Sequence, residues 1–125
     1  IELSAVVIIV GIIVAIAIPT MAKTVERSYW QEAQMLLKAV HDGEQRYFDK
    51  EGFYRTGLGA ASPMAQWREI FVDNPNLLAS IPVTFDVADG VVPGTTFKAT
   101  AARTPGTFMF IDENGTLDTT SWLMP

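Results

Sequence analysis

Cysteine is absent from the 125-residue sequence, and histidine occurs once. Without cysteine the chain can form neither a disulfide framework nor a thiolate metal site, so packing alone must hold the fold together. The one histidine, His41, lies in a stretch of helical periodicity, where it fits a residue on the surface of a helix. Because the sequence shows no cluster of acids, bases or metal ligands, we expect no enzymatic activity.

Basic residues are also scarce. The chain has 9 lysines and arginines against 14 acidic residues, which gives a net charge of −5. The basic residues are scattered from Lys23 to Arg103. Because binding to phosphates needs clustered lysine and arginine, we expect no nucleic acid as a direct specific ligand.

Charge is missing altogether from Leu3–Ile18, which reads LSAVVIIVGIIVAIAI. As a helix, residues 1–20 would be ~30 Å long, about the thickness of the hydrocarbon core of a membrane. No basic segment precedes the run and a helical pattern follows it, so a removable signal peptide fits poorly. Burial inside the fold is the other alternative, but the remaining ~105 residues could hardly cover a helix that is apolar on every side. We therefore expect a helix that can cross a membrane.

Three residues make this apolar segment unusual. Glu2 places a carboxylate at the start of the segment, where an unpaired charge is costly and usually marks a functional residue. The alternative is that Glu2 lies ionised among the lipid headgroups, where the helix N-terminus favours a negative charge. Pro19 removes the hydrogen bond to the Ala15 carbonyl, and Gly11 weakens the helix earlier. Glycine and proline are common in membrane helices. Together, however, they bracket residues 12–18, a segment rich in β-branched side chains that could uncoil at modest cost.

The helical pattern continues beyond Pro19 as one amphipathic stripe, interrupted only by Gly43. Charged residues such as Glu26 and Lys38 fall off the stripe and predict a solvated face. Gly52 is a typical C-terminal stop. The sequence thus predicts one helix of about 50 residues, ~70 Å long, with an apolar first half and an amphipathic second half. The apolar residues of the stripe are Met21, Val25, Tyr29, Ala33, Leu36, Leu37, Val40, Tyr47 and Phe48.

Short helices are predicted next. Residues 57–62 consist mainly of glycine, alanine and serine and predict a loop. Ser62 and Pro63 fit the N-cap and first position of a short helix that reaches Phe71. Another turn is expected at residues 76–79.

Strand patterns fill the rest of the chain. Residues 83–87, 96–101 and 107–111 alternate between apolar and polar side chains, and the Asn114-Gly115 turn leads to Leu117 as a possible fourth strand. We expect an antiparallel meander of three or four strands, one face of which the amphipathic half of the long helix covers. The predicted fold class is α+β.

The beginning of the chain resembles a known family. Ile1-Glu2-Leu3, Gly11-Ile12-Ile13 and the segment 15–19 (AIAIP) are similar to the N-terminal signature of type IV pilins and type II secretion pseudopilins. Residues 47–54 and the late turn at 112–116 resemble the family more loosely. The resemblance implies the pilin fold.

The resemblance also implies how the chain is processed and assembled. Mature chains of the family begin Phe-Thr-Leu-Ile-Glu, so three residues are expected ahead of Ile1. A prepilin peptidase would cleave a basic leader and methylate the new N-terminal phenylalanine. The subunit would stay in the inner membrane until an ATP-driven assembly machine extracts it into a helical filament of identical subunits.

Roles for individual residues follow from the same resemblance. Glu2 would pair with the N-terminal amine of a neighbouring subunit and set the register, and Gly11 and Pro19 would bound the stretch that melts on assembly. The family's C-terminal cysteine pair is missing here, so packing must hold that loop. The filament core would consist of Leu3, Val6, Val7, Ile8, Ile9, Val10, Ile12, Ile13, Val14, Ile16 and Ile18.

The expected organisation has two parts. Residues 1–22 form the half of the helix that spans the membrane or lies in the filament core. Residues 23–125 form the head, made of the amphipathic helix (23–51), an αβ-loop (52–82) and the sheet (83–125).

A calcium site is one reading of the late turn. Asp112, Asn114 and Asp118 have a spacing suggestive of calcium, with the hydroxyls of Thr116 and Thr120 nearby. By resemblance, some pseudopilins bind calcium in this region. A polar hairpin turn explains the same residues equally well, and no other cofactor is expected.

Three functions remain open at this point. The first is a major pilin, inserted in the bacterial inner membrane before assembly and found in an extracellular filament afterwards. The second is a pseudopilin of a type II secretion system. The third is a membrane protein with one span and a periplasmic binding head.

Overall fold

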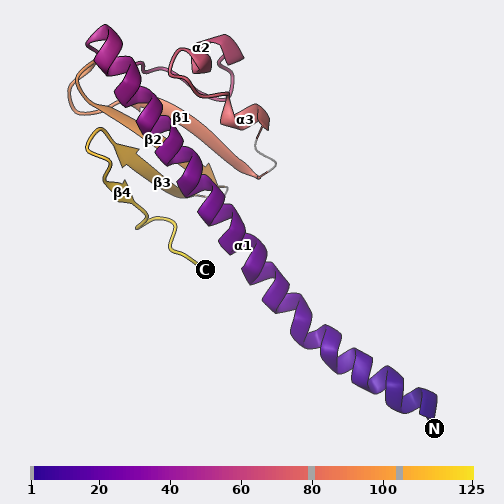
Figure 1. The fold of residues 1–125 in the computed structure, drawn as a ribbon. Helices are drawn as coiled ribbons and strands as arrows, with labels where there is room; N and C mark the ends of the chain where they lie inside the picture. Colours follow the sequence, from indigo (N-terminus) through magenta and orange to yellow (C-terminus); the bar gives the residue numbers. More distant parts are fainter. Residues whose placement is uncertain (1, 79–80, 104–105) are drawn as a thin grey trace.

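The computed structural model describes residues 2–78, 81–103 and 106–125, and it consists of one long helix laid across a small sheet (Figure 1). Ile1, expected at the start of the first helix, and Ala79, expected at the end of a turn, lie outside the described residues. The helices are α1 (Glu2–Glu51), α2 (Met64–Arg68) and α3 (Pro75–Leu78). The strands are β1 (Val83–Asp89), β2 (Phe97–Arg103), β3 (Thr107–Asp112) and β4 (Leu117–Asp118).

Helix α1 runs without a break for 50 residues, through Pro19, which confirms the single long helix expected from the sequence. It ends where Gly52 adopts a left-handed φ of 84°. The Gly52 N–H donates to the Phe48 carbonyl at 2.8 Å and closes the last turn. Glycine takes this conformation without the steric penalty that a side chain would bring.

The four strands form one antiparallel sheet in the order β1-β2-β3-β4, so the predicted meander and the α+β fold class are confirmed. One row of paired residues crosses the sheet through Val87, Ala99, Ile111 and Leu117. The first three of these side chains are buried, whereas their neighbours along each strand are more exposed. This alternation turns one face of the sheet toward α1 and leaves the other to solvent.

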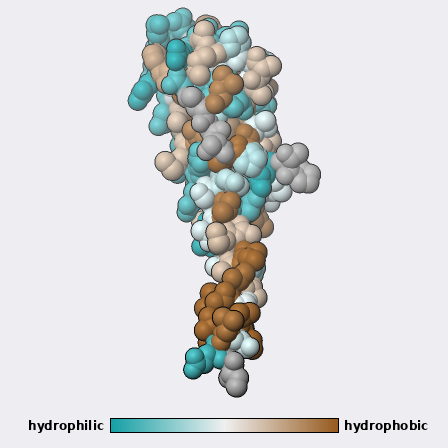
Figure 2. All heavy atoms as spheres, turned by 90° about the vertical axis from the view of Figure 1, so that its right-hand side faces the viewer, coloured by the Kyte–Doolittle hydropathy of each residue, from teal (hydrophilic) through white to brown (hydrophobic). Residues whose placement is uncertain are grey.

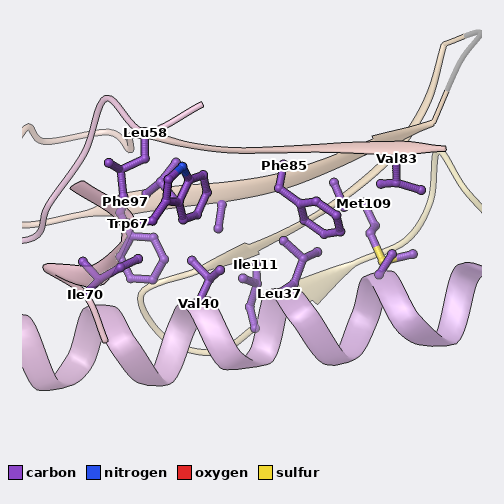
Figure 3. Close-up of a cluster of buried hydrophobic side chains, with 14 of the residues drawn as sticks. Leu37, Val40, Leu58, Trp67, Ile70, Val83, Phe85, Phe97, Met109 and Ile111 are labelled. Carbon is purple, nitrogen blue, oxygen red and sulfur yellow. The ribbon is translucent and has the colours of Figure 1, made fainter. Parts of the chain in front are cut away.

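The core lies between α1 and the sheet, and the segment around α2 closes one end (Figure 3). Leu37 and Val40 point from α1 toward Phe85 and Ile111 on the sheet. The inner strand β2 contributes alanine at two fully buried positions, which leaves room for the helix. The buried side chains labelled in Figure 3 are Leu37, Val40, Leu58, Trp67, Ile70, Val83, Phe85, Phe97, Met109 and Ile111.

Gly43 does more than interrupt the stripe of α1. It is buried where α1 meets the chain that follows α2. A Cβ atom added at this position would lie 2.1 Å from the carbonyl oxygen of Ile70 and 3.0 Å from the Cγ2 of Val72. The absence of a side chain is therefore required for this close approach.

The predicted start and end of the short helix were both wrong. Pro63, not Ser62, is the N-cap residue of α2, because the Ser62 hydroxyl accepts the Gly59 N–H at 2.9 Å and so closes the preceding loop. The helix ends at Arg68. Phe71, expected within it, has a left-handed φ of 61° and a side chain that is 56% exposed.

The outer edge of β1 is covered by groups from the αβ-loop. The Phe85 N–H donates to Asn76 Oδ1 at 2.7 Å, and Asn76 Nδ2 donates to the Phe85 carbonyl at 3.0 Å. Two residues further along, Leu58 and Val87 exchange N–H···O bonds of 3.1 and 2.8 Å. The Asn76 side chain and the Leu58 backbone thus make the hydrogen bonds that a neighbouring strand would otherwise make with β1.

We predict that Gly43→Ala lowers the free energy of unfolding of the head by about 1–3 kcal/mol, because the new methyl group forces the Ile70 backbone away from α1. The measurement is denaturant unfolding of the full chain in detergent, followed by tryptophan fluorescence. Gly11→Ala is the matched control, since no atom lies within 4 Å of its added Cβ. Equal unfolding midpoints for the two variants would contradict the prediction.

Candidate functional site: the exposed half of the first helix

The first half of α1 projects from the head and carries apolar side chains on all sides. Figure 2 shows it as a narrow hydrophobic stem below a head of mixed character. Its large side chains are between 47% (Val14) and 77% (Leu3) exposed. The residues expected in the filament core are all among them: Leu3, Val6, Val7, Ile8, Ile9, Val10, Ile12, Ile13, Val14, Ile16 and Ile18.

This projecting segment meets the requirements for a membrane span. Helix α1 contains an 18-residue window that is strongly apolar and has none of its residues buried in the fold. By length and composition it can cross a membrane, as the sequence predicted. A core helix of a soluble protein would be largely buried instead.

The stem is apolar even where its residues carry hydroxyls. Thr20 donates its hydroxyl to the Ile16 carbonyl at 3.1 Å, and Thr24 donates to the Thr20 carbonyl at 2.9 Å. Hydroxyls that are satisfied within their own helix can enter an apolar environment at little cost. These threonines help to line a shallow, mainly apolar groove of about 570 Å³ on both sides of Pro19 along the helix. Its lining residues are Ile13, Ile16, Ala17, Thr20, Met21, Thr24 and Val25.

The three unusual residues of the stem lie along one helix and do not touch one another. Glu2 is exposed in the first turn, at the positive end of the helix dipole. Gly11 has no neighbouring atom that would exclude a side chain, so the fold of a single subunit does not require glycine there. Pro19 lies within continuous helix. Their expected roles all concern contacts with other copies and stay predictions.

An ion pair joins the head to the base of the stem. Arg103, at the end of β2, donates from Nε to both oxygens of Glu26 at 3.0 and 3.1 Å, and its Nη2 also contacts Glu26. The guanidinium lies 5.2 Å from the centre of the Tyr29 ring. Glu26 was expected on a solvated face; instead it is partly buried and joins α1 to the end of β2. The pairing joins residues 77 positions apart, which the helical pattern alone could not indicate.

The C-terminal segment is held against the same part of α1. Trp122 is buried, and its carbonyl accepts the indole N–H of Trp30 at 2.8 Å. Arg27 donates to the Pro125 carbonyl at 3.1 and 3.3 Å. Packing and these hydrogen bonds hold the segment in the absence of cysteine.

The side chains considered for calcium close a turn. Asp112 Oδ1 accepts the N–H groups of Asn114 and Thr116 at 3.0 and 2.9 Å. Asp118 Oδ1 accepts the hydroxyl and the N–H of Thr120, and these hydrogen bonds lower the pKa of its carboxyl. Within the described residues, no three histidine, cysteine or acidic side chains come together in a way that could hold a metal ion. Calcium binding at this turn stays a prediction.

Helix α1 supports that turn through two side chains. Gln45 Nε2 donates to the Glu113 carbonyl at 2.8 Å, and His41 Nε2 lies 3.2 Å from the same oxygen. His41, expected on the helix surface, is therefore partly buried against the turn, with Gly115 beside its ring. The loop of a distant hairpin covers it, which local periodicity cannot show.

Comparison of the chain with protein-family models, with curated proteins and with solved structures found no match in any of the three. Function must therefore be inferred from the residues of the site. Its main features are an uncovered apolar stem, an acid at the tip of the stem and an ion pair between the head and α1 near the base of the stem.

We predict a favourable coupling of about 0.5–3 kcal/mol between Glu26 and Arg103, because their charges are partly removed from water. The measurement is a double-mutant cycle on the free energy of unfolding with Glu26→Gln and Arg103→Gln. Arg68 and Asp73, whose side chains are 66% and 51% exposed, form the control pair. We expect less than about 1 kcal/mol for that pair, and equal coupling in the two cycles would count against a special role for the Glu26–Arg103 ion pair.

Proposed function

We propose that this chain is the structural subunit of a type IV pilus-like filament and that it polymerises through the exposed half of α1. One observation carries the proposal: the head completes its core without the residues of the stem, which remain exposed. The N-terminal resemblance to type IV pilins and pseudopilins supports it.

The stem needs an apolar environment that its own head does not supply. A lipid bilayer supplies one, and the stems of other copies supply another. Each leucine, isoleucine or valine gains ~1.5–3 kcal/mol when it passes from water to full burial. Lipid already satisfies this requirement, so moving from membrane to filament brings little hydrophobic gain. Because this gain is small, we propose that an ATP-driven assembly machine supplies the energy to extract the subunit from the membrane.

The shape of the subunit favours an open helical polymer. The stem is narrow and the head is wide, so stems can bundle at the centre while heads remain outside (Figures 1 and 2). The Glu26–Arg103 ion pair adds a contact between α1 and the end of β2 at the place where the stem leaves the head. When identical copies meet through two different surfaces and the ring does not close, the result is a helical filament.

Glu2 selects the register between copies in this proposal. A carboxylate among apolar stems adds little stability when paired, but an unpaired one is strongly unfavourable. Only an arrangement that brings a positive group to Glu2 avoids that cost. We propose the N-terminal amine of a neighbouring copy as this group.

An extracellular pilus is the main form of the proposal, with the inner membrane as the location before assembly. A secretion pseudopilus would use the same physical interactions in a shorter filament. Electron microscopy distinguishes them: long surface fibres made mainly of this chain support the pilus, whereas fibres confined to the periplasm support the pseudopilus.

We predict that Glu2→Leu inserts into the membrane at normal levels but gives no filaments, because no charge remains to select the register. The measurements are membrane fractionation and the yield of filaments sheared from cells. Glu51→Leu, at the far end of α1, is the matched control and should leave filament yield near normal. A normal yield from Glu2→Leu would exclude the role of Glu2.

Recovery of the intact chain as a soluble monomer, with residues 3–18 protected inside the head, would overturn the whole proposal. Cysteine substitutions at Ile8 and Ile13 test this directly, since the native chain has no other thiol. In detergent both positions should be shielded by the micelle. Transfer to water without detergent should produce assemblies rather than monomers.

A further inference from the structure

Glu44 is an acidic residue in the buried core of the head, where a charged carboxylate is unfavourable. It lies on the face of α1 that packs into the head, and it is 0% exposed. Its Oε2 accepts the backbone N–H of Arg55 at 2.9 Å. Its Oε1 is buried with no hydrogen-bond partner, the only such side-chain atom among the residues that the structure describes.

The nearby guanidinium does not neutralise this carboxyl. Arg55 directs Nε to Glu69 at 2.7 Å and Nη1 to the Thr56 carbonyl at 2.9 Å. Tyr47 lies close enough to be affected by the charges of Glu44, Arg55 and Glu69, and the carboxylate of Glu51 at the end of α1 also acts on it. His41, one turn earlier on α1, faces the Glu113 turn, and Lys98 of β2 lies over Phe110 on the outer face of the sheet.

Burial therefore dominates the chemistry of Glu44. Loss of water around the carboxyl raises its pKa to about 7, although the N–H bond and the positive charge of Arg55 act in the opposite direction. A protonated carboxyl can be buried at much lower cost than a carboxylate. The folded head thus favours the neutral form of this side chain.

The contact made by Glu44 joins two parts of the head. Arg55 lies between the end of α1 and the bridge that Leu58 makes with the outer edge of β1. On either side of it, the Tyr54 N–H donates to the Gly94 carbonyl and the Thr56 hydroxyl donates to Asp89. Glu44 is the side chain through which α1 holds this segment by its backbone.

We propose that Glu44 acts as a proton-operated latch: when it is neutral it fastens residues 53–58 to α1, and when it ionises it releases them. On ionisation the proton passes to solvent, and the carboxylate gains hydration only if the segment moves away. The inference concerns the head alone and does not depend on the function of the stem.

The direction of the pH effect follows from proton linkage. Below about pH 4.5 Glu44 is protonated in both the closed and the open form, so the latch is fully closed. Between about pH 4.5 and 7 the open form loses its proton and the closed form keeps it. The equilibrium constant for opening then rises up to about tenfold per pH unit, and it levels off above that range.

Hydrogen exchange of the full chain in detergent tests this. Rates are measured at several pH values and corrected for the pH dependence of intrinsic exchange. In the native chain, opening of residues 53–58 should increase by about 40-fold between pH 5 and pH 7. In Glu44→Gln, which resembles the neutral carboxyl, opening should not change with pH.

Peptides from β2 and β3 serve as an internal control, because a local latch should leave their corrected exchange unchanged. Parallel changes in the strands and in residues 53–58 would indicate global unfolding and overturn the latch. So would equal pH dependence in the native chain and in Glu44→Gln.

Glu69→Gln provides a second test that keeps the carboxyl of Glu44 in place. This substitution frees the Arg55 guanidinium to approach Glu44, which stabilises the carboxylate and lowers its pKa. Opening should then reach its plateau at a lower pH than in the native chain. If the pH at which opening of residues 53–58 levels off is the same in Glu69→Gln and in the native chain, the charges around Arg55 do not control the latch.

Discussion

The structure is governed by the apolar surface of the first half of α1, which the head cannot cover. A helix that is apolar on every side is unfavourable in water, so its exposed side chains need an apolar environment that the head does not supply. The remaining structure can be understood from this constraint. The same helix must leave the solvated head at a fixed angle and enter an apolar environment within a few turns, without a break at Pro19.

The second half of α1 attaches the stem to the head. One of its faces completes the core of the head, while Glu26 and Trp30 bind the end of β2 and the C-terminal segment at the point where the stem emerges. A force on the stem is therefore transmitted to the sheet through several contacts. This arrangement lets the head do without a disulfide, since the long helix acts as a shared partner for segments far apart in sequence.

The sequence predicted the features that depend on local patterns. Helical periodicity and Gly52 indicated the length of α1, and alternation indicated three strands within about two residues of their ends. What it missed depends on contacts between distant segments. The burial of Glu44 could not be found from a stripe of apolar residues, because an acid counts there as solvated. Similarly, the closeness of Gly43 to the Ile70 carbonyl exists only once α2 has packed on α1.

The covered edge of β1 has a consequence for the proposed assembly of many copies. An open strand edge is a template for further strands, and crowding such edges together invites amyloid. Asn76 and Leu58 already occupy the hydrogen-bonding groups of Phe85 and Val87. At the opposite side of the sheet, β4 spans only two residues. Heads whose β1 edge is covered and whose other edge strand is short can be packed side by side with less tendency to pair edge to edge.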